Sequence, residues 1–325
     1  MSADDPTQVR KRSRFRRRHA WLLSIGLVVI GIAGFYRYFW FEHPVGSGPA
    51  GPAVPREPFQ RVWSTRKVLL VGLGDSITAG FGATPKHSYF DRLVENPTDE
   101  FETMRRVCLS KVLPKLQERN LAISGSTSVE LRKYLLKRLE TQDRETFGVV
   151  VVTTGGNDLI HNYGRTPPRE GAMYGATFKQ AEPWIKNFDV RLGEILDEIE
   201  SRFPGGCRIF LANIYDPTDD IGDAFNAGLP PWPEGLRIVH AYNDIITRCA
   251  SRRERVHLVD IHGEFLGHGI HCLQFWREHY DADDPRYWYF DNLEDPNDRG
   301  YDAIRRLMLI EIARVLPGVL SDRKQ

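Results

Sequence analysis

Four consecutive valines give the strongest structural signal in this chain of 325 residues. They occupy positions 149–152 inside the uncharged run Phe147–Thr154, which ends at the pair Gly155-Gly156. β-Branched residues favour strands, and a strand that is apolar along its whole length is buried on both faces. Such strands belong to parallel sheets that are covered by helices on both sides. This run therefore constrains the chain to an α/β fold.

Shorter apolar runs alternate with amphipathic stretches through the rest of the sequence. They predict further strands at 68–73, 120–123, 207–214 and 256–261. Helical patterns lie between and after them, at 88–116, 128–139, 179–203, 235–252 and 298–315. Alternating strands and helices indicate a three-layer α/β/α sandwich around a parallel sheet. Ligands of such sheets bind outside the carboxyl ends of the strands.

The N-terminal segment has the composition of a membrane anchor. Residues Ala20–Tyr36 carry no charge, and as a helix they would span about 26 Å, close to the ~30 Å of a hydrocarbon core. Seven Lys or Arg residues lie within 1–20, which places the N-terminus in the cytoplasm and the rest of the chain outside. A cleaved signal peptide is the alternative, but the apolar stretch is longer than usual for one. We expect a cytoplasmic tail at 1–19 and a single transmembrane signal anchor at 20–41.

The remaining sequence predicts a linker and one domain. Residues 42–64 are rich in Pro and Gly, as is typical of a linker, and 65–320 have the length of a single domain. The net charge is +1 although the N-terminal segment is strongly basic, so the domain is mildly acidic and nucleic acid is not an expected partner. The cysteines are far apart in the sequence, so disulfides and buried thiols both remain open. These four residues are Cys108, Cys207, Cys249 and Cys272.

Three short motifs follow the first three predicted strands. The triplet Gly74-Asp75-Ser76 places a serine hydroxyl at a turn, where it could act as a nucleophile. Gly125 and Asn157 follow the second and third strands, and their N–H groups could bind a developing oxyanion. Each motif alone is equally compatible with an ordinary turn or helix cap. Because all three fall at the same edge of the sheet, we expect them to meet in one pocket.

With these motifs the chain resembles the GDSL, or SGNH, hydrolase family over about residues 68–312. The resemblance implies that Ser76 is the nucleophile and that its own backbone N–H also faces the oxyanion. It implies that Gly125 and Asn157, the latter within Gly-Gly-Asn-Asp, are the other oxyanion donors. It also implies a flavodoxin-like parallel sheet, in agreement with the alternation of strands and helices.

The fourth motif of the family is altered here. The family pattern is Asp-x-x-His-Pro-Asn, whereas this chain reads Asn292-Leu-Glu-Asp295-Pro296-Asn297. Asp295 therefore stands at the position of the histidine base, and Asn292 at that of its aspartate partner. A carboxylate with a pKa near 4 is a poor base for a serine hydroxyl unless burial raises that pKa.

Four interpretations of the proton-transfer step follow. His268 or His271, which lie in a histidine-rich segment after the last strand together with His262, could supply the base with Asp295 nearby. Asp295 could act itself, directly or through a water molecule. Histidines and aspartates could hold a metal, or the chain could be a binding protein that has lost catalysis. Our predicted catalytic set is Ser76, Gly125, Asn157, His268, His271 and Asp295.

The expected function is that of a membrane-anchored, extracytoplasmic serine esterase. It would act on acyl esters of glycans or lipids, O-acetyl esters included, through an acyl-serine intermediate. Asp75 and Asp158 are expected to contact the substrate, and neither a cofactor nor a metal is expected. The alternatives are a catalytically inactive surface module that binds glycan or protein, and an acyltransferase. The sequence leaves the oligomeric state open.

Overall fold

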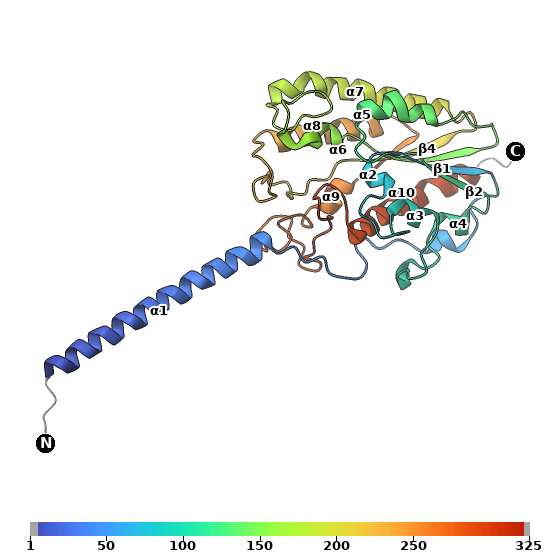
Figure 1. Cartoon of the computed structure of the whole chain (residues 1–325). Helices are drawn as coiled ribbons and strands as arrows, with labels where there is room; N and C mark the ends of the chain where they lie inside the picture. The colour runs from blue at the N-terminus through green and yellow to red at the C-terminus, as the bar shows by residue number, and fades with distance from the viewer. Residues whose placement is uncertain (1–5, 322–325) are drawn as a thin grey trace.

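The computed structural model describes residues 6–321, with side chains from residue 19 onward, and shows one parallel sheet between two helical layers (Figure 1). The strand order is β2-β1-β3-β4-β5, and every neighbouring pair is parallel. This confirms the predicted three-layer α/β sandwich. The strands are β1 (Val68–Gly74), β2 (Leu116–Asn120), β3 (Phe147–Thr153), β4 (Cys207–Ala212) and β5 (Val256–Val259).

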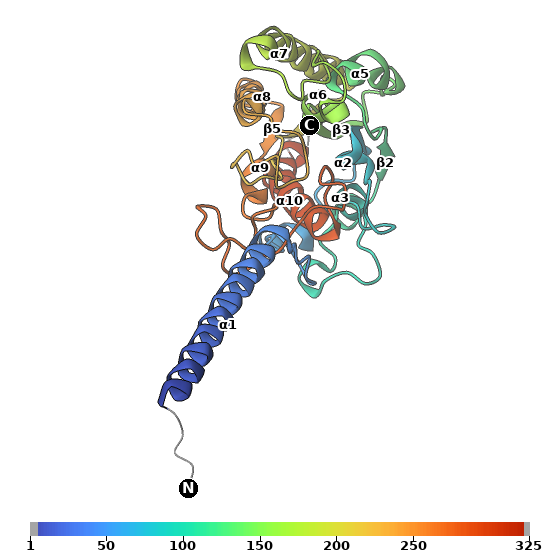
Figure 2. The same cartoon turned by 60° about the vertical axis from the view of Figure 1, so that its left-hand side comes forward.

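Helices cover both faces of the sheet (Figures 1 and 2). One layer contains α7 (Phe178–Ser201), α8 (Gly235–Ser251) and the short α5 (Ser128–Glu130). The opposite layer contains α3 (Tyr89–Val94), α4 (Leu109–Val112) and α10 (Asp298–Ser321). Three further short helices follow strands: α2 (Ser76–Ala79), α6 (Gly156–Ile160) and α9 (Ile261–Phe265).

The interior strand β1 divides its side chains between two hydrophobic cores. Val68 and Leu70 pack in the core beneath α10, whereas Leu69, Val71 and Leu73 pack in the core beneath α7 and α8. Successive residues of a strand point to opposite faces, so a strand buried on both sides must be apolar at every position. This explains why the strand signal in the sequence is a continuous run without alternation.

Two predicted elements differ from the structure. The helix expected at 88–116 is reduced to α3 and α4 joined by irregular segments, because Pro97 and Pro114 cannot continue a helix. The second strand lies at Leu116–Asn120, slightly before the expected 120–123. It is an edge strand whose last four side chains are exposed, and it therefore lacks the apolar pattern that marks the other strands.

All four cysteines are free thiols. Cys108, Cys207 and Cys272 are buried. Burial raises the pKa of Cys207 to about 11 and that of Cys272 to about 12, so both thiols stay protonated at neutral pH. The buried-thiol alternative is the one that the structure shows.

The N-terminal helix α1 (Pro6–Phe41) projects away from the body of the molecule (Figures 1 and 2). Its part His19–Phe41 is 23 residues long, or about 35 Å, and by length and composition it could cross a membrane. Its last turn packs on a loop of the domain, with the rings of Phe39 and Trp40 4.9 and 5.6 Å from the ring of Trp276. The Gln274 amide also donates a hydrogen bond to the Phe39 carbonyl (3.0 Å).

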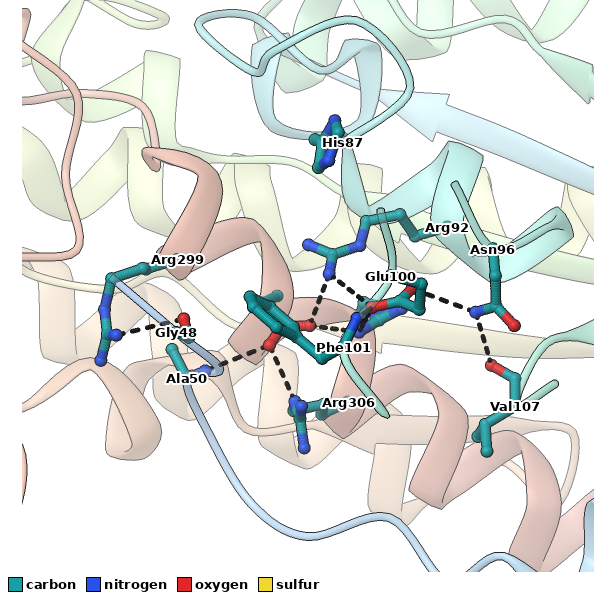
Figure 3. Close-up of polar contacts among 12 residues, drawn as sticks. Gly48, Ala50, His87, Arg92, Asn96, Glu100, Phe101, Val107, Arg299 and Arg306 are labelled. Carbon is teal, nitrogen blue, oxygen red and sulfur yellow. Dashed lines mark hydrogen bonds and ion pairs between the residues drawn. The ribbon is translucent and has the colours of Figure 1, made fainter. Parts of the chain in front are cut away.

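The predicted linker packs along α10 (Figure 3). The Ala50 N–H donates to the Asp302 carboxylate (3.1 Å), Arg306 donates to the Pro52 carbonyl (3.2 Å), and Arg299 donates to the Gly48 carbonyl (3.2 Å). The only regular structure between 42 and 64 is the single 3-10 turn Glu57–Gln60. The segment is therefore irregular, as its composition predicts, but it lies against the domain.

A buried ion network joins α3 to α10 in the same region (Figure 3). The Arg92 guanidinium lies 3.0 Å from the Glu100 carboxylate and 3.2 Å from that of Asp302, and Arg305 binds both carboxylates. Arg306 also binds Asp302 (3.0 Å). Burial alone would raise the pKa of Glu100, but Arg305 and Arg92 outweigh it and lower that pKa to about 2.

Removing the Glu100 charge should strongly destabilise the fold. We expect Glu100→Gln to lower the free energy of unfolding by about 3–5 kcal/mol, because Arg92 and Arg305 would keep buried charges without enough partners. Because the folded-state pKa is lowered, this contribution is present above the ordinary pKa of about 4.3 and is lost as the pH falls towards 2. Urea unfolding followed by circular dichroism measures the change.

The matched control is Glu102→Gln, which removes an exposed ion pair with Arg105. It should alter the unfolding free energy by less than about 0.5 kcal/mol. Equal effects of the two substitutions would mean that the buried network does not stabilise the fold.

Candidate active site

The turn between β1 and α2 shows why the first motif reads Gly-Asp-Ser. Gly74 has φ 128°, and a Cβ atom there would lie 1.8 Å from the Thr153 carbonyl oxygen, so only glycine fits between the two strands. The Asp75 carboxylate caps α2 by accepting hydrogen bonds from the Ile77 N–H (3.2 Å) and the Thr153 hydroxyl (2.7 Å). Ser76 is the first residue of the helix that this turn begins.

Two hydrogen bonds hold the loops that follow β2 and β3 against this turn. The Ser126 hydroxyl donates to the Gly74 carbonyl (2.8 Å), and the Asn157 amide donates to the Ser126 carbonyl (3.0 Å). Gly125, next to Ser126, is in the left-handed region (φ 80°), and its N–H meets no acceptor among the described residues. The three motifs therefore lie in direct contact.

Ser76 and Asn157 line the same pocket. A side-chain amide has two N–H donors, and Asn157 uses one of them on Ser126, so the second is available to a ligand. Gly125 does not line this pocket, although it adjoins the residue that Asn157 binds. Asp75 lines the pocket while remaining only 3% exposed.

Asp295 is the titratable group of the altered fourth motif that the structure brings to Ser76. Its Oδ2 accepts a hydrogen bond from the Asn292 amide (2.7 Å), whereas its buried Oδ1 makes no hydrogen bond of normal geometry with the described residues. Burial raises the pKa of Asp295, and the nearby Ser76 hydroxyl and the Asn292 amide lower it in part. Hydrogen bonds at catalytic groups are often long without substrate and shorten when it binds. The Asp295 carboxyl and the Ser76 hydroxyl are therefore neighbours.

The hydrogen bond between positions 292 and 295 runs opposite to the one that the family pattern implies. In the Asp-x-x-His pattern an aspartate would accept a hydrogen bond from the imidazole, but here the Asn292 amide donates one to the Asp295 carboxylate. An aspartate at 292 would instead place two carboxylates in contact, which is unfavourable. The two departures from the family pattern are therefore chemically matched to each other.

Other carboxyl groups surround this pair. Burial raises the pKa of Asp75 to about 6, with the Asp295 charge as a further contribution, while Thr153 and the Ile77 N–H lower it. Burial and the Asp295 charge raise the pKa of Glu294, which lines the pocket, to about 7. Among the described residues that line the pocket there is no histidine.

The structure does not bring His268 and His271 to Ser76. His268 is 4% exposed and stacks on Trp288 with the ring centroids 3.4 Å apart, and its Nδ1 lies 3.0 Å from the Arg286 carbonyl oxygen. His271 is 3% exposed, and burial lowers its pKa to about 4. Packing in the long segment after β5 therefore fixes both imidazoles away from the pocket, and the prediction of a rerouted histidine base is not supported.

Asp158 has a structural position and not the substrate contact that we expected. It is fully buried and does not line the pocket. Its carboxylate accepts the Ser128 N–H (3.2 Å), and its carbonyl accepts the Met173 N–H (2.9 Å). Asp158 thus fixes the start of α5 and the segment after α6.

The sequence analysis did not predict the residues that form the pocket wall. The pocket has an empty volume of about 1090 Å³, including open solvent at its mouth. Tyr215, which follows β4 at the same sheet edge, lines it and donates a hydrogen bond to the Glu294 carbonyl (2.5 Å). The position after β4 was a signal that could have been used, because β4 ends beside β3. The apolar part of the wall includes Leu159, Ile214, Leu229, Trp232, Leu236 and Val239.

Known structures with a similar fold include several ester hydrolases. An extracellular lipase from Streptomyces rimosus is 18% identical with a TM-score of 0.46, covering 73% of this chain and 97% of that one. An acetylxylan esterase from Geobacillus stearothermophilus is 17% identical with a TM-score of 0.46, covering 77% and 94%. A psychrotrophic esterase from Pseudoalteromonas sp. is 16% identical with a TM-score of 0.42, covering 76% and 97%.

Sequence comparison is more specific. No curated protein sequence matches the chain. The profile of the GDSL-like lipase/acylhydrolase family matches residues 73–303, which is more than half of the chain and extends from the end of β1 into α10. The chain therefore belongs to the GDSL-like lipase/acylhydrolase family.

Proposed function

We propose that the chain is a membrane-anchored serine esterase in which Ser76 is the nucleophile and Asp295 the general base. One observation carries this proposal: the buried Asp295 carboxyl lies beside the hydroxyl of Ser76, and Ser76 lines one pocket together with Asn157. A buried carboxylate with a raised pKa is a stronger base than an exposed one. Of the four interpretations of the proton step, direct action of Asp295 is the one with this geometric support.

The reaction follows from these positions. Ser76 Oγ bonds to the ester carbonyl carbon while its proton passes to Asp295, and the carbonyl oxygen becomes an oxyanion near the free amide N–H of Asn157. Asp295 returns the proton to the leaving alcohol as the carbon–oxygen bond breaks, leaving an acyl-serine. Water then attacks the acyl carbon and gives a proton to Asp295, which passes that proton to Ser76 Oγ as the acyl–oxygen bond breaks and the acid leaves.

The pocket wall favours an apolar acyl group over acetyl. Leu159, Trp232, Leu236 and Val239 form a surface far larger than a methyl group can cover. Each buried CH₂ contributes about 0.8 kcal/mol. We therefore narrow the substrate class from acyl esters in general to esters of longer acyl chains, such as those of lipids.

The N-terminal helix would place the domain at a membrane, where lipid esters are found. The helix His19–Phe41 could span a membrane, and the basic residues before it favour a cytoplasmic N-terminus. The domain would then lie outside the cytoplasm. Because Phe39 and Trp40 pack directly on Trp276, the domain is held close to the end of the helix. Lipid esters are accordingly the substrates that lie within its reach.

Ester length should control turnover if the apolar wall binds the acyl chain. We expect kcat/KM for p-nitrophenyl esters to rise by roughly fourfold per CH₂ from acetate to longer chains. Ser76→Ala should reduce turnover by about 10³-fold or more for every ester. Initial rates with the full chain in detergent micelles measure both effects.

A bulky substitution in the pocket wall tests whether the acyl chain binds there. Val239→Trp should lower the ratio of octanoate to acetate turnover, because the indole would occupy acyl space. Ester turnover that survives in Ser76→Ala would refute the assignment of Ser76 as the nucleophile. An octanoate-to-acetate ratio that Val239→Trp leaves unchanged would refute only the claim that the apolar wall binds the acyl chain.

Replacement of Asp295 by histidine should preserve activity only when residue 292 is replaced as well. We expect Asp295→Asn to lower kcat by about 10²–10⁴-fold, because the amide cannot accept the Ser76 proton. The double substitution Asn292→Asp with Asp295→His should recover activity, since an aspartate at 292 can accept a hydrogen bond from the imidazole. Asp295→His alone should recover less. Wild-type kcat in Asp295→Asn would exclude Asp295 as the base.

The pH dependence of kcat/KM reports the state of the same carboxyl. Asp295 must be ionised to act, and burial raises its pKa, so the acid limb should lie above the ordinary pKa of about 3.9. The Asn292 amide lowers that pKa, so Asn292→Ala should move the limb to higher pH. A limb that stays in place would assign it to another carboxyl, such as Asp75 or Glu294.

A binding module is the second candidate, favoured by the absence of a histidine from the described pocket lining. It would keep the apolar pocket without the chemistry. Saturable binding of a fatty acid by both wild type and Ser76→Ala, with no turnover of any ester by folded protein, would select it.

A further inference from the structure

We propose that Asp220, His240 and His262 form a divalent transition-metal site, with Zn²⁺ as the ion that fits it best. The three side chains come from separate elements: the loop after β4, helix α8 and helix α9. One ligand atom from each lies within 4.8 Å of the other two. This site is distinct from Ser76 and Asp295, and it revises the expectation that no metal is bound.

The spacing of the ligand atoms suits a tetrahedral ion. Asp220 Oδ2 lies 3.2 Å from His262 Nε2, and Asp220 Oδ1 lies 3.7 Å from His240 Nε2. Two ligand atoms each about 2.0–2.2 Å from Zn²⁺ lie roughly 3.3–3.5 Å apart at tetrahedral angles. Small rotations of the exposed His240 ring would therefore bring all three atoms to bonding distance.

The surroundings of His262 orient it as a ligand. Its Nδ1 lies 2.8 Å from the Ile214 carbonyl oxygen, which can only accept, so Nδ1 carries the proton. In the neutral ring Nε2 then presents a lone pair to the Asp220 carboxylate, and two acceptors at 3.2 Å need a cation or a proton between them. Metal-bound histidines typically make this kind of hydrogen bond from the second ring nitrogen to a carbonyl.

Asp220 supplies an independent observation. Its Oδ1 is buried and has no hydrogen-bond partner among the described residues, although it points to the cluster. Asp220 and Asp219 both have positive φ (57° and 55°), a conformation that is uncommon outside glycine. The Asp219 carboxylate holds this turn by accepting the N–H groups of Gly267 (3.0 Å) and Gly269 (2.8 Å). The backbone is thus fixed in the shape that presents Asp220.

The donor set determines the class of ion. Two imidazoles and one carboxylate suit Zn²⁺ and Co²⁺ better than Ca²⁺ or Mg²⁺, which prefer all-oxygen ligands. The carboxylate of Asp216, which accepts the Asp220 N–H (3.0 Å), adds negative charge behind the cluster. His240 is 45% exposed, so a fourth position is open to water.

A metal here would brace the pocket wall. The loop that supplies Asp220 also supplies Ile214 and Tyr215 to the pocket, and Val239 on α8 precedes His240. One ion would cross-link this loop to α8 and α9, so we assign it a structural role.

Cobalt titration of the metal-stripped full chain in detergent micelles tests the site, because Co²⁺ reports tetrahedral binding by its visible absorption. We expect one Co²⁺ per chain, displacement by Zn²⁺, and a Tm that rises with Zn²⁺ concentration. His240→Gln and Asp220→Asn should each weaken Co²⁺ binding by at least about tenfold. Circular dichroism checks that both variants fold, which is expected for the exposed His240.

The matched control is His87→Gln, since His87 Nε2 also lies 3.2 Å from a carboxylate, that of Asp99, but outside any cluster of three ligands among the described residues. Co²⁺ binding should be unchanged in this variant. Absence of saturable binding to the wild type, or binding that His240→Gln leaves unaltered, would overturn the proposal and mark any bound metal as adventitious.

Discussion

The parallel pairing of β1 with both β2 and β3 is the constraint on which the rest of the structure depends. In this register Gly72 lies opposite Asn120 on one side, and Gly74 lies opposite Thr153 on the other. The three strands therefore end at the same edge of the sheet, and the loops that follow β2 and β3 are close enough for the hydrogen bond from Asn157 to the Ser126 carbonyl. Because no side chain fits at position 74, the turn between β1 and α2 keeps this shape only with glycine there.

A carboxylate in place of an imidazole changes the electrostatics of the site without dismantling its frame. Asn297, the last residue of the altered motif, still donates to the Tyr287 and Tyr289 carbonyls and accepts the Gly300 N–H, so the loop keeps its connection to α10. A base that becomes neutral on protonation also suits a pocket already rich in carboxyl groups. The positive charge of an imidazolium would be stabilised more strongly by the nearby Asp75 carboxylate. An imidazole at 295 would, however, need a hydrogen-bond acceptor at 292, and the Asn292 amide group that faces residue 295 is a donor.

Strongly patterned features were predictable from the sequence, and those that depend on tertiary contacts were not. Continuous apolar runs revealed β1 and β3, and amphipathic periodicity revealed α7 and α8. The exposed edge strand β2 has no such pattern and was displaced by a few residues in the prediction.

The contacts of Ser76 and Asn157 were predictable from the strand ends and from the family resemblance. The positions of His268 and His271 were not predictable, because the long segment after β5 determines the stacking of His268 on Trp288 and the burial of His271. The cluster of Asp220, His240 and His262 was equally hidden, since its members lie on three elements with no common spacing.

The central claim is that the Ser76 hydroxyl is activated by the Asp295 carboxyl. The most direct measurement is peptide mass spectrometry of the folded full chain after reaction with a fluorophosphonate, comparing wild type with Asp295→Asn. The account predicts one adduct per chain, on the peptide that contains Ser76, formed much more slowly in the variant. An adduct on another serine such as Ser124, no adduct at all, or equal rates in the two proteins would contradict it.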